Sequence, residues 1–288
     1  ACGDTLEHLR GQIPRDLPRL RDLDYPACIS NSISLSTFHG CPAEEIERIC
    51  EFLLGEMDCD VVVKMNPPML GRERLEHLLH DVLGYAELRV PDHAYERGLR
   101  FDEAVQMCGR LTAAATARGR RFGAKFTNTL EVENRGGGVF PAGNRVMYLS
   151  GRPLHVLALA LADEFRGAVG PAVPFSFSAG VDQHNFAKTV ACGFCPVTVC
   201  TDLLRPGGYG RLPAYLKALS SEMRKTGATT IGEYIPAAHA SQQVCGPGSV
   251  DPTGGAGALT GIPATGTRPT QAGPADEGVG PTAATAAA

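Results

Sequence analysis

A lysine at the end of an apolar run is the first residue whose type and position could do chemistry. Lys64 follows three valines and precedes Met65, Asn66 and Pro67. Because burial of a lone ammonium is costly, we expect Lys64 to face a solvated site or a partner charge. There the cation could stabilise a developing negative charge. A lysine that only reaches water from a strand end is the alternative.

A second apolar run carries another lysine and, three residues later, an asparagine. Side chains alternate along a strand, so Lys125 and Thr127 share one face while Phe126 and Asn128 share the other. Asn128 offers two donors and an acceptor, which suit a planar, amide-like ligand. An asparagine that caps a loop is the alternative.

A thiol stands next to a histidine where a helix should begin, in His39-Gly40-Cys41-Pro42. The helix N-terminus and the imidazole should lower the pKa of the Cys41 thiol. Such a thiol could serve as a general acid/base or as a nucleophile. A small buried cysteine is the alternative.

Two successive predicted strands end in small and polar residues that could bind phosphate. Ser178-Ala179-Gly180 ends one strand and Thr201-Asp202 ends the next. Loops at these positions of α/β barrels often bind phosphate through backbone N–H groups. The nearby cysteines 192, 195 and 200 have a spacing like that of iron–sulfur ligands. We interpret them as buried structural thiols and predict no metal site.

The elements that must position these residues are apolar runs alternating with helical patterns. The predicted strands are Ile29–Thr37, Val61–Asn66, Ala86–Val90, Phe122–Thr129, Val173–Ala179 and Val197–Asp202. The predicted helices are Pro42–Met57, Arg72–Leu83, Asp102–Arg118, Arg152–Arg166, Gln183–Cys192 and Arg211–Lys225. This alternation predicts a parallel sheet, and the continuous apolar runs are typical of strands buried on both faces.

Polar clusters close five of these strands, which favours a (β/α)8 TIM-type barrel with its site at the carboxyl ends of the strands. A doubly wound sheet would instead concentrate function at one switch point. A closed barrel needs eight strands, and six are found. Either strands are missing upstream or the count is too low, so we expect a barrel that is incomplete at its N-terminus.

Charge, hydropathy and cysteine use exclude several classes. The formal charge of -4 gives no basic surface for nucleic acid. The longest apolar run, Val156–Ala162, has seven residues, whereas a membrane span needs roughly 20. No signal peptide is visible, and ten cysteines scattered singly indicate reduced thiols. We therefore expect a cytoplasmic protein without a membrane span or a nucleic-acid partner.

Composition also divides the chain. Residues 1–28 are expected to be a remnant of upstream sequence, and residues 29–235 the partial barrel. From Gly246 to Ala288 no aromatic residue occurs, and Gly, Ala, Pro and Thr dominate. Such a segment buries too little apolar area to offset its ordering entropy. We therefore predict a low-complexity, disordered tail over residues 236–288.

Several motifs together resemble the selenate reductase iron–sulfur subunit family. The resemblance runs from about Ile29 to about Lys225 and is carried by the segments 34–42, 63–67, 125–129, 147–152 and 202–209. Those proteins resemble fusions of a dihydroorotate dehydrogenase-like FMN barrel to an iron–sulfur module that binds flavin and NAD(P)H. Dihydropyrimidine dehydrogenase is a related arrangement.

The resemblance implies roles for particular residues. It implies that Lys64 contacts the flavin and, as a cation, stabilises its anionic reduced form. It implies an acid/base role for Cys41. The expected substrate-binding residues are Ser34, Asn66 and Asn128, and the expected cofactor-binding residues are Lys64, Lys125, Ser150, Gly151, Gly180 and Thr201. Ser34 replaces the asparagine of the dehydrogenases, which puts a pyrimidine substrate in doubt, and Ala179 replaces a glycine and should crowd the phosphate.

The resulting hypothesis is a flavin-dependent oxidoreductase domain that passes a hydride or electrons to a small-molecule substrate through FMN. Iron–sulfur clusters, FAD and NAD(P)H are expected in parts of the parent protein or in partner subunits, and this chain alone should be inactive. Two alternatives stay open. One is a non-catalytic barrel that scaffolds an electron-transfer complex. The other is a phosphate-binding lyase that uses Lys64 or Lys125 as a Schiff base.

Overall fold

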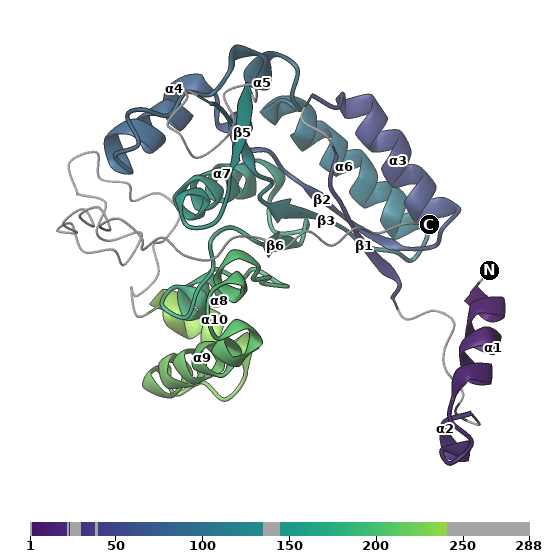
Figure 1. Ribbon diagram of the computed structural model, residues 1–288. Helices are drawn as coiled ribbons and strands as arrows, with labels where there is room; N and C mark the ends of the chain where they lie inside the picture. Colours follow the sequence, from purple (N-terminus) through teal and green to yellow (C-terminus); the bar gives the residue numbers. More distant parts are fainter. Residues whose placement is uncertain (1, 22, 24–29, 38–39, 135–144, 241–288) are drawn as a thin grey trace, which may run out of the picture.

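A four-stranded parallel sheet forms the centre of the molecule (Figure 1). The computed structural model describes residues 2–21, 23, 30–37, 40–134 and 145–240. The strands are β1 (Ser32–Leu35), β2 (Asp60–Lys64), β3 (Phe122–Phe126) and β6 (Phe175–Phe177), and they pair in the order β1-β2-β3-β6. Val197 adds a single parallel bridge to Phe177 on the outer side of β6. The sheet is therefore parallel throughout, as the strand–helix alternation predicts.

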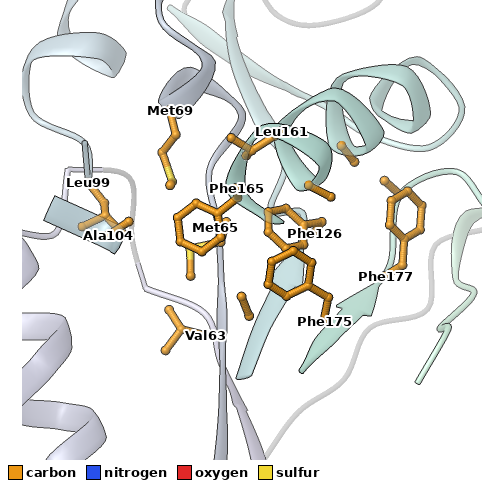
Figure 2. Packing of buried hydrophobic residues seen from close by; sticks show 14 of the residues in the cluster. Val63, Met65, Met69, Leu99, Ala104, Phe126, Leu161, Phe165, Phe175 and Phe177 are labelled. Atoms are coloured by element: carbon orange, nitrogen blue, oxygen red, sulfur yellow. The ribbon is translucent and has the colours of Figure 1, made fainter. Parts of the chain in front are cut away.

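Helices cover one face of this sheet because alternate strand residues on that face are apolar. The helix α3 (Ala43–Gly55) packs on β2, while α6 (Phe101–Ala117) and α7 (Pro153–Val169) pack on β3. Figure 2 shows Phe126 of β3 between Phe165 of α7 and Phe175 of β6. The ring centroid of Phe126 lies 5.9 Å from that of Phe165 and 4.7 Å from that of Phe175. Such burial is the main source of stability here.

The remaining elements continue the chain around this core. The N-terminal helices are α1 (Cys2–Gln12) and α2 (Pro18–Arg21); after β2 come the 3-10 turn η1 (Pro67–Leu70), α4 (Arg72–Glu76), the π-helical turn η2 (His77–Val82) and α5 (Asp92–Glu96). An antiparallel hairpin joins β4 (Leu130–Glu133) to β5 (Val146–Leu149). The C-terminal part holds α8 (Phe186–Ala191), the turns η3 (Thr201–Leu204) and η4 (Gly208–Arg211), α9 (Leu212–Thr226) and α10 (Ile231–Ala240). In the described part of the chain, no helix has both the length and the apolar character that crossing a bilayer requires.

Two predicted strands are corrected by the structure. Residues 86–90 form a turn and extended chain instead of a strand. Residues 197–202 contribute only the bridge at Val197 before the chain turns into η3. The hairpin β4–β5 is missed by the sequence reading because Leu130–Glu133 alternates apolar and acidic residues over only four positions.

The folded part of the chain extends past the boundary at residue 235 that composition suggests. Helix α10 crosses this boundary and packs on α8 and α9, with Ala238 buried. The Tyr234 hydroxyl donates a hydrogen bond to the carbonyl oxygen of Ala187 (3.2 Å). The structured region therefore reaches at least Ala240, and residues 241–288 of the predicted tail lie outside the described residues.

Candidate functional site

Two lysines and a serine lie side by side near the carboxyl ends of β2, β3 and β6. Lys64 is the register partner of Lys125, and Lys125 is the register partner of Ser176. Register partners in a parallel sheet point to the same face. Val63 and Phe126, which precede and follow these lysines in their strands, belong to the core under the helices. The row Lys64–Lys125–Ser176 therefore points away from the helices, as the proposed role of Lys64 requires.

This row holds positive charge without a protein counter-charge. Within the described residues, neither lysine ammonium has a hydrogen bond or an ion pair. Lys125 is 8% exposed, and burial together with the neighbouring Lys64 lowers its pKa. The Ser176 hydroxyl and the Asn66 side-chain oxygen are also buried without a partner. Buried polar groups are rarely left unsatisfied, so this set is suited to a polar ligand.

Replacing Lys125 with methionine is expected to raise the free energy of unfolding by about 1 kcal/mol or more at neutral pH, because an unpaired buried cation is removed. The lowered pKa of Lys125 means that the unfolded chain binds this proton more tightly than the folded chain. The penalty is complete below the folded pKa and fades as pH approaches 10.5, the ordinary value. The gain should therefore shrink over that window, as measured by chemical denaturation at several pH values.

The matched control is Lys217→Met, on the exposed face of α9. This variant should leave the free energy of unfolding nearly unchanged at every pH, because surface substitutions usually have effects within about 0.5 kcal/mol. A Lys125→Met gain that does not shrink with rising pH would contradict the interpretation.

The three expected substrate-binding residues lie in or just after the carboxyl ends of β1, β2 and β3, but they differ in exposure and in hydrogen bonding. The Asn128 amide N–H donates to the Met65 carbonyl oxygen (2.8 Å), which holds Asn128 beside the end of β2. Its side-chain oxygen accepts a hydrogen bond from the Thr129 amide (3.0 Å). Asn128 thus acts partly as the loop cap that sequence reasoning left open. Asn66 is buried, whereas Ser34 is exposed on β1, in register with Val62 on the face that carries Lys64.

A second group of predicted residues meets where three loops touch. Gly151, Gly180 and Thr201 line one small cavity of about 20 Å³, together with Arg152, Val181, Asp182, Asp202 and Arg205. The contacts are close: a Cβ on Gly151 would lie 3.1 Å from the Thr201 methyl group. Three of the expected cofactor residues are therefore adjacent. Ser150 is exposed next to Gly151 and does not line the cavity.

Ion pairs brace the wall of this cavity. Sequence reasoning named Asp202 and Arg152 within motifs but missed their partners. Arg152 donates to Asp182 (2.7 Å). Asp202 accepts two hydrogen bonds from Arg211, each of 3.0 Å, and one from the Tyr215 hydroxyl (2.6 Å). The hydrogen bonds from Arg211 and Tyr215 lower the pKa of Asp202. The sequence offers Arg205 and Arg211 shortly after Asp202, but their positions do not reveal the pairing.

Replacing Gly180 with alanine is expected to destabilise the fold by about 2 kcal/mol. Gly180 has φ +56, and a Cβ there would lie 2.5 Å from the Gly151 carbonyl oxygen and 2.6 Å from the Arg152 Cα. Gly193 is the matched control, because it also has positive φ, +82, but nothing lies within 4 Å of its Cβ position. Thermal or chemical denaturation should show Gly180→Ala to be the more harmful change. Equal losses of stability in the two variants would mean that the close backbone contact at Gly180 does not contribute to the free energy of unfolding.

Ala179 does not crowd the cavity, contrary to expectation. Its side chain is fully buried in the hydrophobic core, and it is absent from the cavity lining. Its carbonyl oxygen pairs with the ring Nδ1 of the buried His155 (2.8 Å). Burial lowers the pKa of His155, so a neutral imidazole on α7 fixes the loop that carries Gly180.

The expected activation of Cys41 is wrong. The thiol is 3% exposed within the hydrophobic core, and burial followed by the nearby Glu45 raises its pKa. A hydrogen bond with Thr37 opposes this effect. His39, the other half of the predicted pair, lies outside the described residues. Cys41 is therefore a protonated, buried thiol, as the structural alternative predicted.

The expected burial of the three later cysteines is also wrong. Cys192, Cys195 and Cys200 are exposed. Cys200 is exposed because the chain from Val197 to Asp202 leaves the sheet instead of forming a buried strand, and Cys192 and Cys195 lie in the turn between α8 and Val197. Among the residues that the structure describes, no group of three or more His, Cys, Asp or Glu side chains is arranged to hold a metal ion.

Fold and site together define a class, the parallel α/β domain of the TIM-barrel type with polar groups at the carboxyl ends of its strands. The sequence model of the family described as "Oxidoreductase YgfK, N-terminal TIM-barrel domain" matches residues 5–244. The chain belongs to this family of oxidoreductase domains.

Relatives in two Escherichia coli strains, K12 and O157:H7, carry the name oxidoreductase YgfK. Each is 37% identical over 194 residues, which is 67% of this chain and 18% of the relative. The chain thus spans less than a fifth of the length of these relatives. Two DHODH structures from Eimeria tenella, one ligand-free and one with ferulenol, are each 16% identical. They match 68% of this chain and 59% and 57% of their own chains, with TM-scores of 0.36 and 0.35.

Proposed function

We propose that this domain binds FMN and carries a flavin-dependent oxidoreductase reaction at the carboxyl edge of its sheet. The observation that carries the proposal is the row of unpaired cations, Lys64 and Lys125, beside the unsatisfied oxygens of Ser176 and Asn66. A flavin ring offers carbonyl acceptors and an N–H donor, so its polar edge suits the Lys64 ammonium and the Asn66 oxygen of this set. The resemblance at residues 63–67 and 125–129 points the same way.

In the proposal, the phosphate of FMN binds at the open side of the cavity between the loops, because the cavity itself, at about 20 Å³, has room for little more than a water molecule. Backbone N–H groups beside Gly151, Gly180 and Thr201 are the groups that hold phosphate in barrels of this kind. Arg205 lines the same cavity and lies 3.8 Å from Asp202. Because Asp182 pairs with Arg152 and Asp202 also pairs with Arg211, the three arginines outnumber the two carboxylates by one positive charge. Gly180 permits the close approach of two loops that a Cβ would prevent. These residues fit the group.

FMN, when bound, supplies the capacity to accept and donate a hydride or single electrons. In the proposal, the chain contributes binding and electrostatics. Lys64 stabilises the negative charge that builds up on reduction. Asn128, held beside β2 by its backbone, orients the small-molecule substrate through its side-chain amide. The raised pKa makes the Cys41 thiol a weaker acid. Cys41 therefore has no step in the proposed reaction.

The proposal extends to the parent protein and its setting. Electrons reach the domain from NAD(P)H through FAD and iron–sulfur clusters, as in the selenate reductase-like proteins that the motifs resemble. The free thiols of the described part, including the exposed Cys195 and Cys200, suit a reducing cytoplasm. The isolated chain lacks an electron source in this scheme and should be inactive.

The experiment that tests the proposal is reconstitution of the purified chain with FMN, followed by gel filtration and absorbance spectroscopy. A bound flavin band that titrates to one equivalent supports the proposal. Gly180→Ala should weaken FMN binding more than riboflavin binding, because riboflavin has no phosphate for the loops to hold. A chain and a full-length parent that both remain free of flavin would overturn the proposal.

The lyase alternative is favoured by one specific observation. Lys125 is buried beside Lys64, and both effects lower its pKa, which is the arrangement that makes a lysine amine nucleophilic. Incubation with a carbonyl compound such as pyruvate and sodium borohydride, followed by mass spectrometry, would detect a trapped adduct on Lys125. Trapping without flavin binding would favour the lyase over the oxidoreductase.

A further inference from the structure

Lys125 adds a second cation to a face where one is enough for a flavin ring. A reduced flavin carries one negative charge, and in the proposed function Lys64 balances it. Adjacent parallel strands lie about 4.8 Å apart, so Lys125 stands one strand away in the same row. Besides burial, the charge of Lys64 lowers the pKa of Lys125, so the two ammonium groups repel each other, and an anion near both would offset this repulsion.

We propose that Lys125 and Ser176 bind the anionic group of the substrate, a carboxylate or an inorganic oxyanion, beside the ring that Lys64 contacts. The inference rests on the proposed function, because it names the class of substrate that the same site would take. A charged donor and a hydroxyl donor in register make two hydrogen bonds to one anionic group possible. Lys125 thereby becomes a specificity-determining residue.

No carboxylate of the described chain takes this place. Asp60 lies on the same face of β2, but at the opposite end of the strand. It accepts hydrogen bonds from the backbone (2.9 Å) and the side chain (3.0 Å) of Arg121. Asn66 presents an oxygen acceptor without a partner, and an oxygen acceptor cannot replace an anion. The positive charge of Lys125 is thus available for a ligand.

Burying an unpaired cation also lowers the stability of the fold, and such a residue can be kept during evolution when its charge has a function. Lys125 is 8% exposed, and methionine has nearly its shape without its charge. A protein without use for this charge would be more stable with an apolar residue. The anion that we propose would offset this cost on binding.

The test uses acetate and acetamide, two probes of nearly equal size of which only acetate is charged. Lysine side chains are labelled with 13C at Cε, and NMR follows the resonances of Lys125 and its register partner Lys64 during titration with each probe. In Lys125→Met the Lys64 resonance remains as the reporter. We expect acetate to bind at least about tenfold more tightly than acetamide. Lys125→Met should remove most of this difference, and Ser176→Ala should reduce it while keeping the cation. Lys217→Met, on exposed α9, should keep it.

Running the titration both without flavin and with FMN separates the two proposals. Acetate preference in a chain that does not bind FMN would sink the flavin assignment and keep the anion site. FMN binding with equal affinity for acetate and acetamide would keep the flavin and overturn the anion site. An acetate preference that survives both Lys125→Met and Ser176→Ala would also overturn it, because the anion would then bind elsewhere.

Discussion

Replacing Asp202 with alanine is expected to lower the free energy of unfolding by about 3 kcal/mol. The carboxylate is 6% exposed and accepts hydrogen bonds from Arg211 and Tyr215. Its loss would leave a partly buried guanidinium and a buried hydroxyl without their acceptor. Urea denaturation followed by circular dichroism measures the effect. Removing the carboxylate would loosen η3, which holds Thr201 at the cavity, so FMN binding should weaken as well.

Tyr215→Phe is the graded control for this network. It removes one hydrogen bond and keeps the Asp202–Arg211 pair, so the expected loss is about 1 to 2 kcal/mol. The pH dependence has a defined sign. Because Arg211 and Tyr215 lower the pKa of Asp202, its stabilisation is present above the ordinary carboxyl pKa of 3.8 and disappears as pH falls through the folded value. An Asp202→Ala variant as stable as the wild type would contradict the role given to the network.

Replacing Lys64 with methionine in the full-length parent is expected to reduce the rate of flavin reduction by about 10²- to 10³-fold. The reason is electrostatic: the variant keeps the packing of β2 but loses the cation that opposes the charge of the reduced ring. Stopped-flow absorbance of the flavin band measures the rate. The reduction potential of the bound flavin should fall in parallel, which a purely structural role for Lys64 would not produce.

Lys188→Met provides the matched control, because Lys188 is exposed on α8 and away from the row Lys64–Lys125–Ser176. Its flavin should be reduced at the wild-type rate and keep the wild-type potential. Equal rates in wild type and Lys64→Met, with flavin bound in both, would remove Lys64 from the mechanism.

Strands and helices with a strong local signal could be predicted from the sequence. The valine run before Lys64 and the apolar stripes of α3, α6 and α7 need no tertiary information, since their periodicity reports which side is buried. The orientation of Lys64 away from the core was expected from the cost of burying a lone ammonium, and alternation along the strand was used for the second apolar run. The same reasoning put Lys125 on the face opposite Phe126, where the structure has it.

Features that depend on distant partners could not be predicted. The raised pKa of Cys41 comes from the core that encloses it, and a helix-start motif carries no information about that core. Asp202 acquires its role from Arg211 and Tyr215, which reach it only after η3, η4 and α9 fold back. The exposure of Cys200 likewise depends on where the chain leaves the sheet. Pairwise tertiary contacts decided each of these cases.

The contact between Gly180 and the Gly151–Arg152 backbone has a mechanical consequence. Two loops that touch main chain to main chain have no side chain between them to deform, so a displacement of one is transmitted directly to the other. His155 ties the first of these loops to α7 through Ala179. A ligand that displaced the Gly180 loop would therefore also displace the Gly151–Arg152 backbone and the part of α7 that carries His155.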